Sequence, residues 1–100
     1  MPSMSLSMPH SLGQEEALRR LKAAIEKAKS RNEGKVSNLK EDWNGNRLDY
    51  SFSTFGFNIK GDVAVEPNEV KLNGSLPFAA MMFKGKIEQT VRDELGKILA

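Results

Sequence analysis

The alternation of apolar and polar residues through the second half of the chain is the feature that most constrains its fold. Leu48, Tyr50 and Phe52 alternate with polar residues, and the segments 57–65 and 70–73 continue the pattern. A period of two is typical of a strand with one face buried and the other in water. These segments therefore predict antiparallel strands in one sheet that needs cover on only one face.

Turn residues separate the predicted strands. The dipeptide Asn44-Gly45 predicts a hairpin with a type I′ turn, because both residues tolerate the positive φ angles that this turn requires. Gly56 and the segment 66–69 predict the other reversals. The apolar residues of the segment 36–43 fall on both parities, which indicates an edge strand with a bulge. The sequence therefore predicts a meander of four consecutive strands.

A further strand is predicted at the start of the chain. Met4, Leu6 and Met8 alternate with polar residues, which indicates a short half-buried strand that ends at Pro9. Residues 1–3 are expected to be disordered, because nothing in their sequence fixes them.

Two segments have helical periodicity. Ser11 followed by Gln14 is typical of a capping box, so the first helix is predicted over residues 12–31. Pro77 suits the first turn of a second helix, and Gly85 weakens that helix locally by roughly 1 kcal/mol, which predicts an irregular start. The apolar stripe of the second helix comprises Phe83, Ile87, Val91, Leu95 and Ile98.

The order strand, helix, four strands, helix predicts a single α+β domain over residues 1–100. One layer is the antiparallel meander sheet. The other layer consists of the two amphipathic helices, since only they are available to cover the apolar face of the sheet.

The composition offers few groups for catalysis. The chain has no cysteine and a single histidine, His10, whose neighbour Ser11 is assigned to the helix cap. We therefore predict that the protein is not an enzyme and has no catalytic, cofactor-binding or metal-binding residue, and we assign His10 to ordering the turn. The net charge is +2, and residues 33–76 carry five basic and seven acidic residues, so nucleic acid is not an expected partner.

Six consecutive apolar residues form an unusual run that one helical face cannot bury. A helix through this run places Ala80 and Phe83 on the buried stripe and points Phe78 and Met82 away from it. Apolar side chains left outside the core predict an adsorptive surface, since thioethers adapt to irregular apolar partners. Two alternatives remain open: the run wraps the edge of a broad sheet, or a homodimer covers it. The run is far too short to span a membrane. The predicted granule or partner surface is Phe78, Met81, Met82 and Phe83.

Aromatic residues on the apolar face of the meander permit a second hypothesis. They would line a cavity for a small acyl ligand between sheet and helices, or else pack as ordinary core. The residues concerned are Tyr50, Phe52, Phe57 and Ile59.

A histidine-x-leucine-glycine motif, made of His10, Leu12 and Gly13, precedes the first predicted helix. Further characteristic segments are Trp43-Asn44-Gly45-Asn46, Phe55-Gly56-Phe57, Gly61 with Val63 and Val65, and Leu76-Pro77. With these motifs the chain resembles, over nearly its whole length, the polyhydroxyalkanoic acid system family. These are small proteins encoded beside bacterial genes for storage-polyester metabolism.

The resemblance implies a bacterial cytoplasmic protein that is linked to polyhydroxyalkanoate granules, with the granule surface or granule proteins as partners. It carries over no catalytic residue, and we assign a structural role to the motif at His10. The leading hypothesis is a non-catalytic protein that adsorbs on granules, or regulates them, through the apolar run, assisted by Arg19, Arg20 and Lys27. A meander followed by a long helix also looks like a reduced helix-grip domain, a lipid-binding architecture, which keeps a small acyl-ligand module as the alternative.

Overall fold

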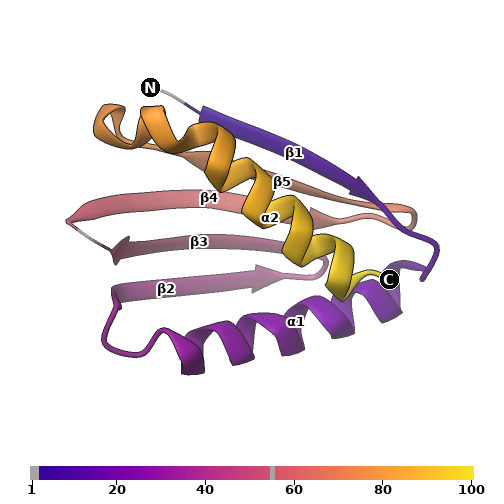
Figure 1. The fold of residues 1–100 in the computed structure, drawn as a ribbon. Coiled ribbons are helices and arrows are strands. Elements are labelled where there is room, and N and C mark those ends of the chain that lie inside the picture. Colours follow the sequence, from indigo (N-terminus) through magenta and orange to yellow (C-terminus); the bar gives the residue numbers. More distant parts are fainter. Residues whose placement is uncertain (1–2, 55) are drawn as a thin grey trace.

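The computed structural model describes residues 3–54 and 56–100 and has the predicted α+β architecture (Figure 1). Ser3 already belongs to a strand, while residues 1–2 of the stretch expected to be disordered lie outside the described residues. The elements are β1 (Ser3–Pro9), α1 (Gln14–Arg31), β2 (Val36–Asn44), β3 (Arg47–Thr54), β4 (Phe57–Val65), β5 (Glu69–Ser75), the 3₁₀ helix η1 (Phe78–Phe83) and α2 (Lys84–Ile98).

The strands form one antiparallel sheet of five strands in the order β1-β5-β4-β3-β2. The last four strands are the predicted meander, and β1 pairs with β5 at the far edge. The register places one apolar residue of each strand directly opposite the next, which forms an apolar row across the whole sheet. Residues opposite each other point to the same face, so this whole row lies on one face. This row is Leu6, Leu72, Val63, Leu48 and Trp43.

Both helices pack on this apolar face, as predicted. The larger core cluster joins Ala17 and Leu21 of α1 to Leu95 of α2 and to buried residues of the sheet such as Leu48. A smaller cluster beneath the first half of α2 contains Met4, Leu6 and Leu76. Figure 1 shows the two helices close together near the C-terminus and diverging toward the opposite end of the sheet. The described core is therefore densest where the helices meet.

Polar contacts attach α1 to the edge strand β2. The Lys22 ammonium lies 4.9 Å from the centroid of the Trp43 ring, which is a cation–π contact. The Lys29 ammonium donates to a carboxylate oxygen of Glu41 at 2.9 Å and to one of Glu26 at 3.0 Å. These bonds, Glu41 first, raise the pKa of Lys29. The helix thus covers β2 with long side chains rather than with a continuous apolar stripe.

The start of α1 differs from the prediction of a capping box. The N-cap is Gly13, with φ of 81°, no side chain caps the helix, and the helix begins at Gln14 rather than at residue 12. Glycine tolerates this left-handed backbone, which other residues disfavour. The Gln14 side chain is engaged elsewhere, since its Nε2 donates to the Val65 carbonyl at 2.8 Å. Ser11 is therefore not the cap.

The hairpin between β2 and β3 is present, but its turn is shifted by one residue. Asn44 pairs with Arg47, so the loop is Gly45-Asn46, and only Gly45 has a positive φ, 62°. This pattern corresponds to type II′ rather than the predicted type I′. Asn46 is held by β4: its Nδ2 donates to the Val65 carbonyl, and its carbonyl accepts from the Val65 N–H, both at 2.8 Å.

The predicted bulge in β2 is confirmed. The register with β3 shifts between Ser37 and Lys40, and Asn38 has a left-handed φ of 55°. Because of this bulge, two residues of β2, Asn38 and Leu39, lie opposite the single residue Phe52 of β3.

The irregular start predicted for the second helix is η1, whose first backbone bond runs from the Ala80 N–H to the Pro77 carbonyl at 2.9 Å. Gly85 is the second residue of α2, directly after this irregular turn.

Candidate functional site

The predicted apolar surface is divided between solvent and core. Met82 is 82% exposed and Phe83 is 54% exposed, whereas Met81 packs against the smaller core cluster. The side chain of Phe78 lies outside the described residues. Of the three predicted residues whose side chains are described, Met82 and Phe83 are thus available to a partner.

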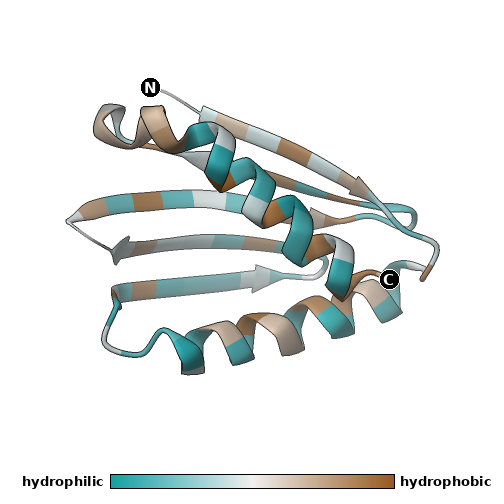
Figure 2. Cartoon of the chain, viewed as in Figure 1, coloured by the Kyte–Doolittle hydropathy of each residue, from teal (hydrophilic) through white to brown (hydrophobic). Residues whose placement is uncertain are grey.

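Other apolar side chains lie at the same end of the sheet. Ile59 pairs with Phe52, and neither they nor Phe57 belongs to either core cluster of the described residues, although all three are half-buried. Lys60, the next residue of β4, pairs with Ser75, from which the chain runs into η1. Figure 2 shows apolar residues at this end of β4 and in η1. We call the following residues the apolar end: Leu39, Phe52, Phe57, Ile59, Met82 and Phe83.

Leu39 is the member of the apolar end that sequence reasoning missed. It is 39% exposed and, among the residues whose side chains the structure describes, is one of three exposed large hydrophobic residues, with Met82 and Phe83. Its parity in β2 is set by the bulge at Asn38. The apolar residues of both parities in this segment predicted a bulge but not which residue would face outward.

Exposed lysines lie near the apolar end in the chain, although Lys40 and Lys60 point to the opposite face of the sheet from Phe52 and Ile59. Lys35, Lys40, Lys60 and Lys86 are exposed, and within the described part of the chain they form no ion pair. Lys84, by contrast, pairs with Glu88 at 3.9 Å. The positive charge of Lys40 and Lys60 thus lies behind the apolar end, on the other face of the sheet.

Of the three basic residues predicted to assist adsorption, two are engaged by other groups of the protein. Arg19 and Arg20 lie in the first half of α1, away from the apolar end, and both donate to the carboxylate of Glu16. These bonds, Arg19 first, lower the pKa of Glu16 from 4.5 to about 2. Arg20 also donates to the carbonyl of Ala100. Arg20 thus ties the helix to the C-terminal residues, and Arg19 is engaged by Glu16 of the same helix, so only Lys27, in the second half of α1, remains a candidate.

Tyr50, one of the predicted acyl-site residues, lies across two glycines. The register aligns it with Gly61 and, one strand further, with Gly74. Its hydroxyl donates to the Asn73 carbonyl at 3.2 Å, and burial, with the nearby Asp62 carboxylate, raises the pKa of Tyr50. The ring stacks on Phe52 with centroids 6.1 Å apart. Tyr50 therefore fills the space that the glycines leave empty.

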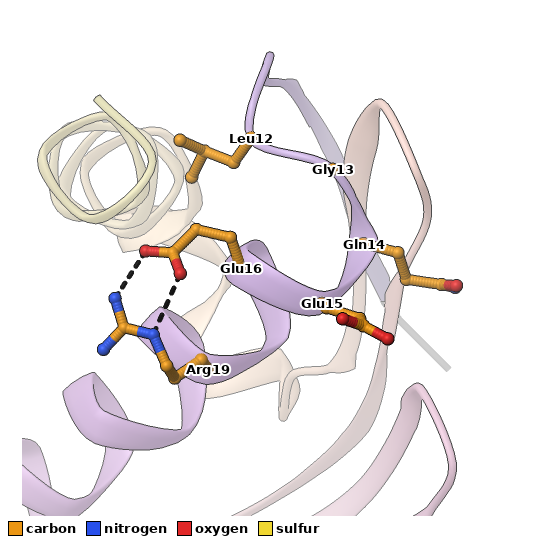
Figure 3. A pocket seen from close by; sticks show the side chains of 6 residues that line it. All are labelled: Leu12, Gly13, Gln14, Glu15, Glu16 and Arg19. Atoms are coloured by element: carbon orange, nitrogen blue, oxygen red, sulfur yellow. Dashed lines mark hydrogen bonds and ion pairs between the residues drawn. The ribbon is translucent and has the colours of Figure 1, made fainter.

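Two surface depressions lie elsewhere. Figure 3 shows the first, at the start of α1, where the Arg19 guanidinium pairs with Glu16. The second lies along β1 and includes Ser5, Ser7 and Arg92. Neither is lined by any of the four residues predicted for an acyl site, so the geometry does not favour that alternative.

His10 of the sequence motif is held by backbone groups. The Leu12 N–H donates to Nδ1 at 3.1 Å, and Nε2 lies 3.1 Å from the Glu66 carbonyl, an arrangement that requires the neutral tautomer with the proton on Nε2. The His10 N–H donates to the Asn68 carbonyl at 2.9 Å. The ring thus links the turn before α1 to the turn between β4 and β5.

We expect His10→Ala to lower the free energy of unfolding by about 2 kcal/mol, because both side-chain hydrogen bonds are lost in a half-buried turn. His10→Asn should cost about half as much, since an asparagine oxygen accepts readily from the N–H two residues on, in place of Nδ1. Urea unfolding of both variants measures the difference. Equal losses would mean that the bond to Leu12 contributes nothing.

The family comparison supplies the remaining evidence. A family model described as "Putative polyhydroxyalkanoic acid system protein" matches residues 4–99. No curated protein matches the chain. Among the described residues, no helix is long and apolar enough to cross a membrane, and no group of three or more metal-binding side chains is close enough to hold an ion.

Proposed function

Because the chain belongs to the polyhydroxyalkanoic acid system family, we propose that it is a non-catalytic protein that adsorbs on polyhydroxyalkanoate storage granules in the cytoplasm through its apolar end. The observation that supports this most is the exposure of Met82 and Phe83, at 82% and 54%. Large apolar side chains that protrude together are typical of a surface that a partner covers.

Adsorption would bury side chains that folding leaves in water. Complete burial of a methionine or phenylalanine side chain is favourable by about 1.5–3 kcal/mol, and Met82 and Phe83 retain more than half of their exposure. The methionine also adapts to an irregular polymer surface, because its side chain is unbranched and polarisable. Burial of these two side chains would therefore favour attachment by a few kcal/mol.

The test is sedimentation with purified granules. We expect Met82→Ser combined with Phe83→Ser to lower the partition coefficient about tenfold or more, because each 1.4 kcal/mol is a factor of ten. Lys97→Ser, at the exposed far end of α2, is the matched surface control and should sediment like the unmodified protein. Circular dichroism checks that each variant is folded.

Granules stripped of protein identify the partner. Retained binding to stripped granules, lost in the double variant, would indicate contact with the polyester itself, and binding only to native granules would indicate a granule protein. If the folded double variant sediments with native granules as well as the unmodified chain does, the apolar end is not the adsorbing surface.

A further inference from the structure

The two edges of the sheet differ in how they are protected against pairing. Edge strands commonly carry charges or bulges, which prevent addition of another strand. The β2 edge has both, with the bulge at Asn38 and exposed lysines Lys35 and Lys40 beside it. By contrast, β1 pairs with β5 in unbroken register over Ser3–Pro9 and contains no charged residue.

The backbone of β1 presents unpaired groups along this edge. In an antiparallel ladder, alternate residues turn their N–H and C=O groups to opposite sides. The His10 N–H donates to the Asn68 carbonyl, which continues the ladder and shows that even-numbered residues face β5. The N–H and C=O groups of Ser3, Ser5 and Ser7 therefore point outward. Pro9, which has no N–H, also falls at an outward position, where proline is tolerated.

We propose that β1 pairs with β1 of a second copy of the chain, so that two sheets join in a symmetric dimer. A two-fold axis beside Leu6 places Ser5 opposite Ser7 of the second copy and Ser3 opposite its Pro9. In this register every outward N–H meets a carbonyl, and the missing N–H of Pro9 leaves no donor without a partner. An edge of this kind is self-complementary, as a two-fold interface requires.

The side chains of β1 suit the same register. Met4, Leu6 and Met8 lie on the helix-covered face, so pairing places Leu6 beside its own copy and Met4 beside Met8 of the second copy. The serine side chains lie on the other face, where the uncharged Ser5 of each copy would lie opposite Ser7 of the other copy. The charges closest to this edge are Lys71, the partner of Ser7 in β5, and Arg92 of α2, and both line a depression with Ser5 and Ser7. Repulsion between two copies of Arg92 should make the dimer weaker at low salt than at high salt.

The test compares two double variants with the unmodified full chain by sedimentation equilibrium. Ser5→Lys with Ser7→Lys places like charges opposite each other twice in the dimer, and we expect a dissociation constant about tenfold or more above that of the unmodified chain. Ser5→Lys with Ser7→Glu places opposite charges there, and its dimer should be at least as stable as the unmodified one. Both variants lose the bond from Ser5 Oγ to Asn73, so this loss cancels.

Three results would overturn the proposal. They are a monomer at all concentrations of the unmodified chain, equal weakening by the two double variants, and dissociation by Met82→Ser, which would assign the contact to the apolar end. Because Met82→Ser should leave the dimer intact, this test is independent of granule binding. Circular dichroism of each variant separates loss of pairing from loss of folding.

Discussion

Gly61→Ala is expected to lower the free energy of unfolding by about 3 kcal/mol or more, because no room exists for a methyl group. A Cβ atom on Gly61 would overlap the Asn73 carbonyl oxygen and lie 2.8 Å from Cα of Gly74, and both are backbone atoms of the next strand. It would also lie 2.7 Å from the Tyr50 hydroxyl. Urea unfolding should give a lower midpoint with an unchanged slope.

Two other glycines act as controls for this prediction. At Gly74 the nearest contacts of an added Cβ include the Tyr50 hydroxyl at 3.3 Å and the Met4 methyl group at 3.8 Å, which are side chains that can move, so Gly74→Ala should cost about 1 kcal/mol. Gly96 lies in α2 with nothing within 4 Å, and Gly96→Ala should stabilise the chain by up to about 1 kcal/mol. Equal losses at Gly61 and Gly74 would contradict the close backbone approach.

Leu48→Ala is expected to cost about 3 kcal/mol, because it opens a cavity where both helices meet the sheet. Leu48 is only 3% exposed and belongs to the larger core cluster with Leu21 of α1 and Leu95 of α2. Thermal or urea unfolding measures the loss, and the unfolding transition should remain cooperative.

The matched control is Leu39→Ala, the same substitution in the neighbouring edge strand. Leu39 is 39% exposed, so its truncation should change the free energy of unfolding by no more than about 0.5 kcal/mol. A comparable loss at both positions would mean that Leu39 is buried in solution, and the apolar end would then be smaller than described.

The architecture could be predicted from the sequence because it depends on periodicity. Alternation around Leu48 and the stripe through Leu95 determine which faces are buried, and burial then brings sheet and helices together. The start of α1 could not be predicted in this way. Gln14 matches the pattern of a capping box, but its partner is the carbonyl of Val65, 51 residues away, and no local rule detects such a contact.

The candidate surface was predicted only in part, for a similar reason. The run of apolar residues indicated that Met82 would point away from the core, as it does, but not that Met81 would pack inward or that Phe83, expected on the buried stripe, would be 54% exposed. That difference depends on the 3₁₀ geometry of η1, whereas the prediction assumed α-helical spacing. The exposure of Leu39 likewise depends on the exact position of the bulge in β2.

The divergence of the two helices implies that resistance to local opening is unequal along the sheet. Amide hydrogen exchange should be slowest around Leu48, Val63 and Val65, where side chains of both helices contact the strands. At Phe52 and Ile59, outside both core clusters, exchange should proceed through small fluctuations that leave the rest of the domain intact. The protein would thus be more pliable at the apolar end, the surface proposed to adsorb, than where its two helices join.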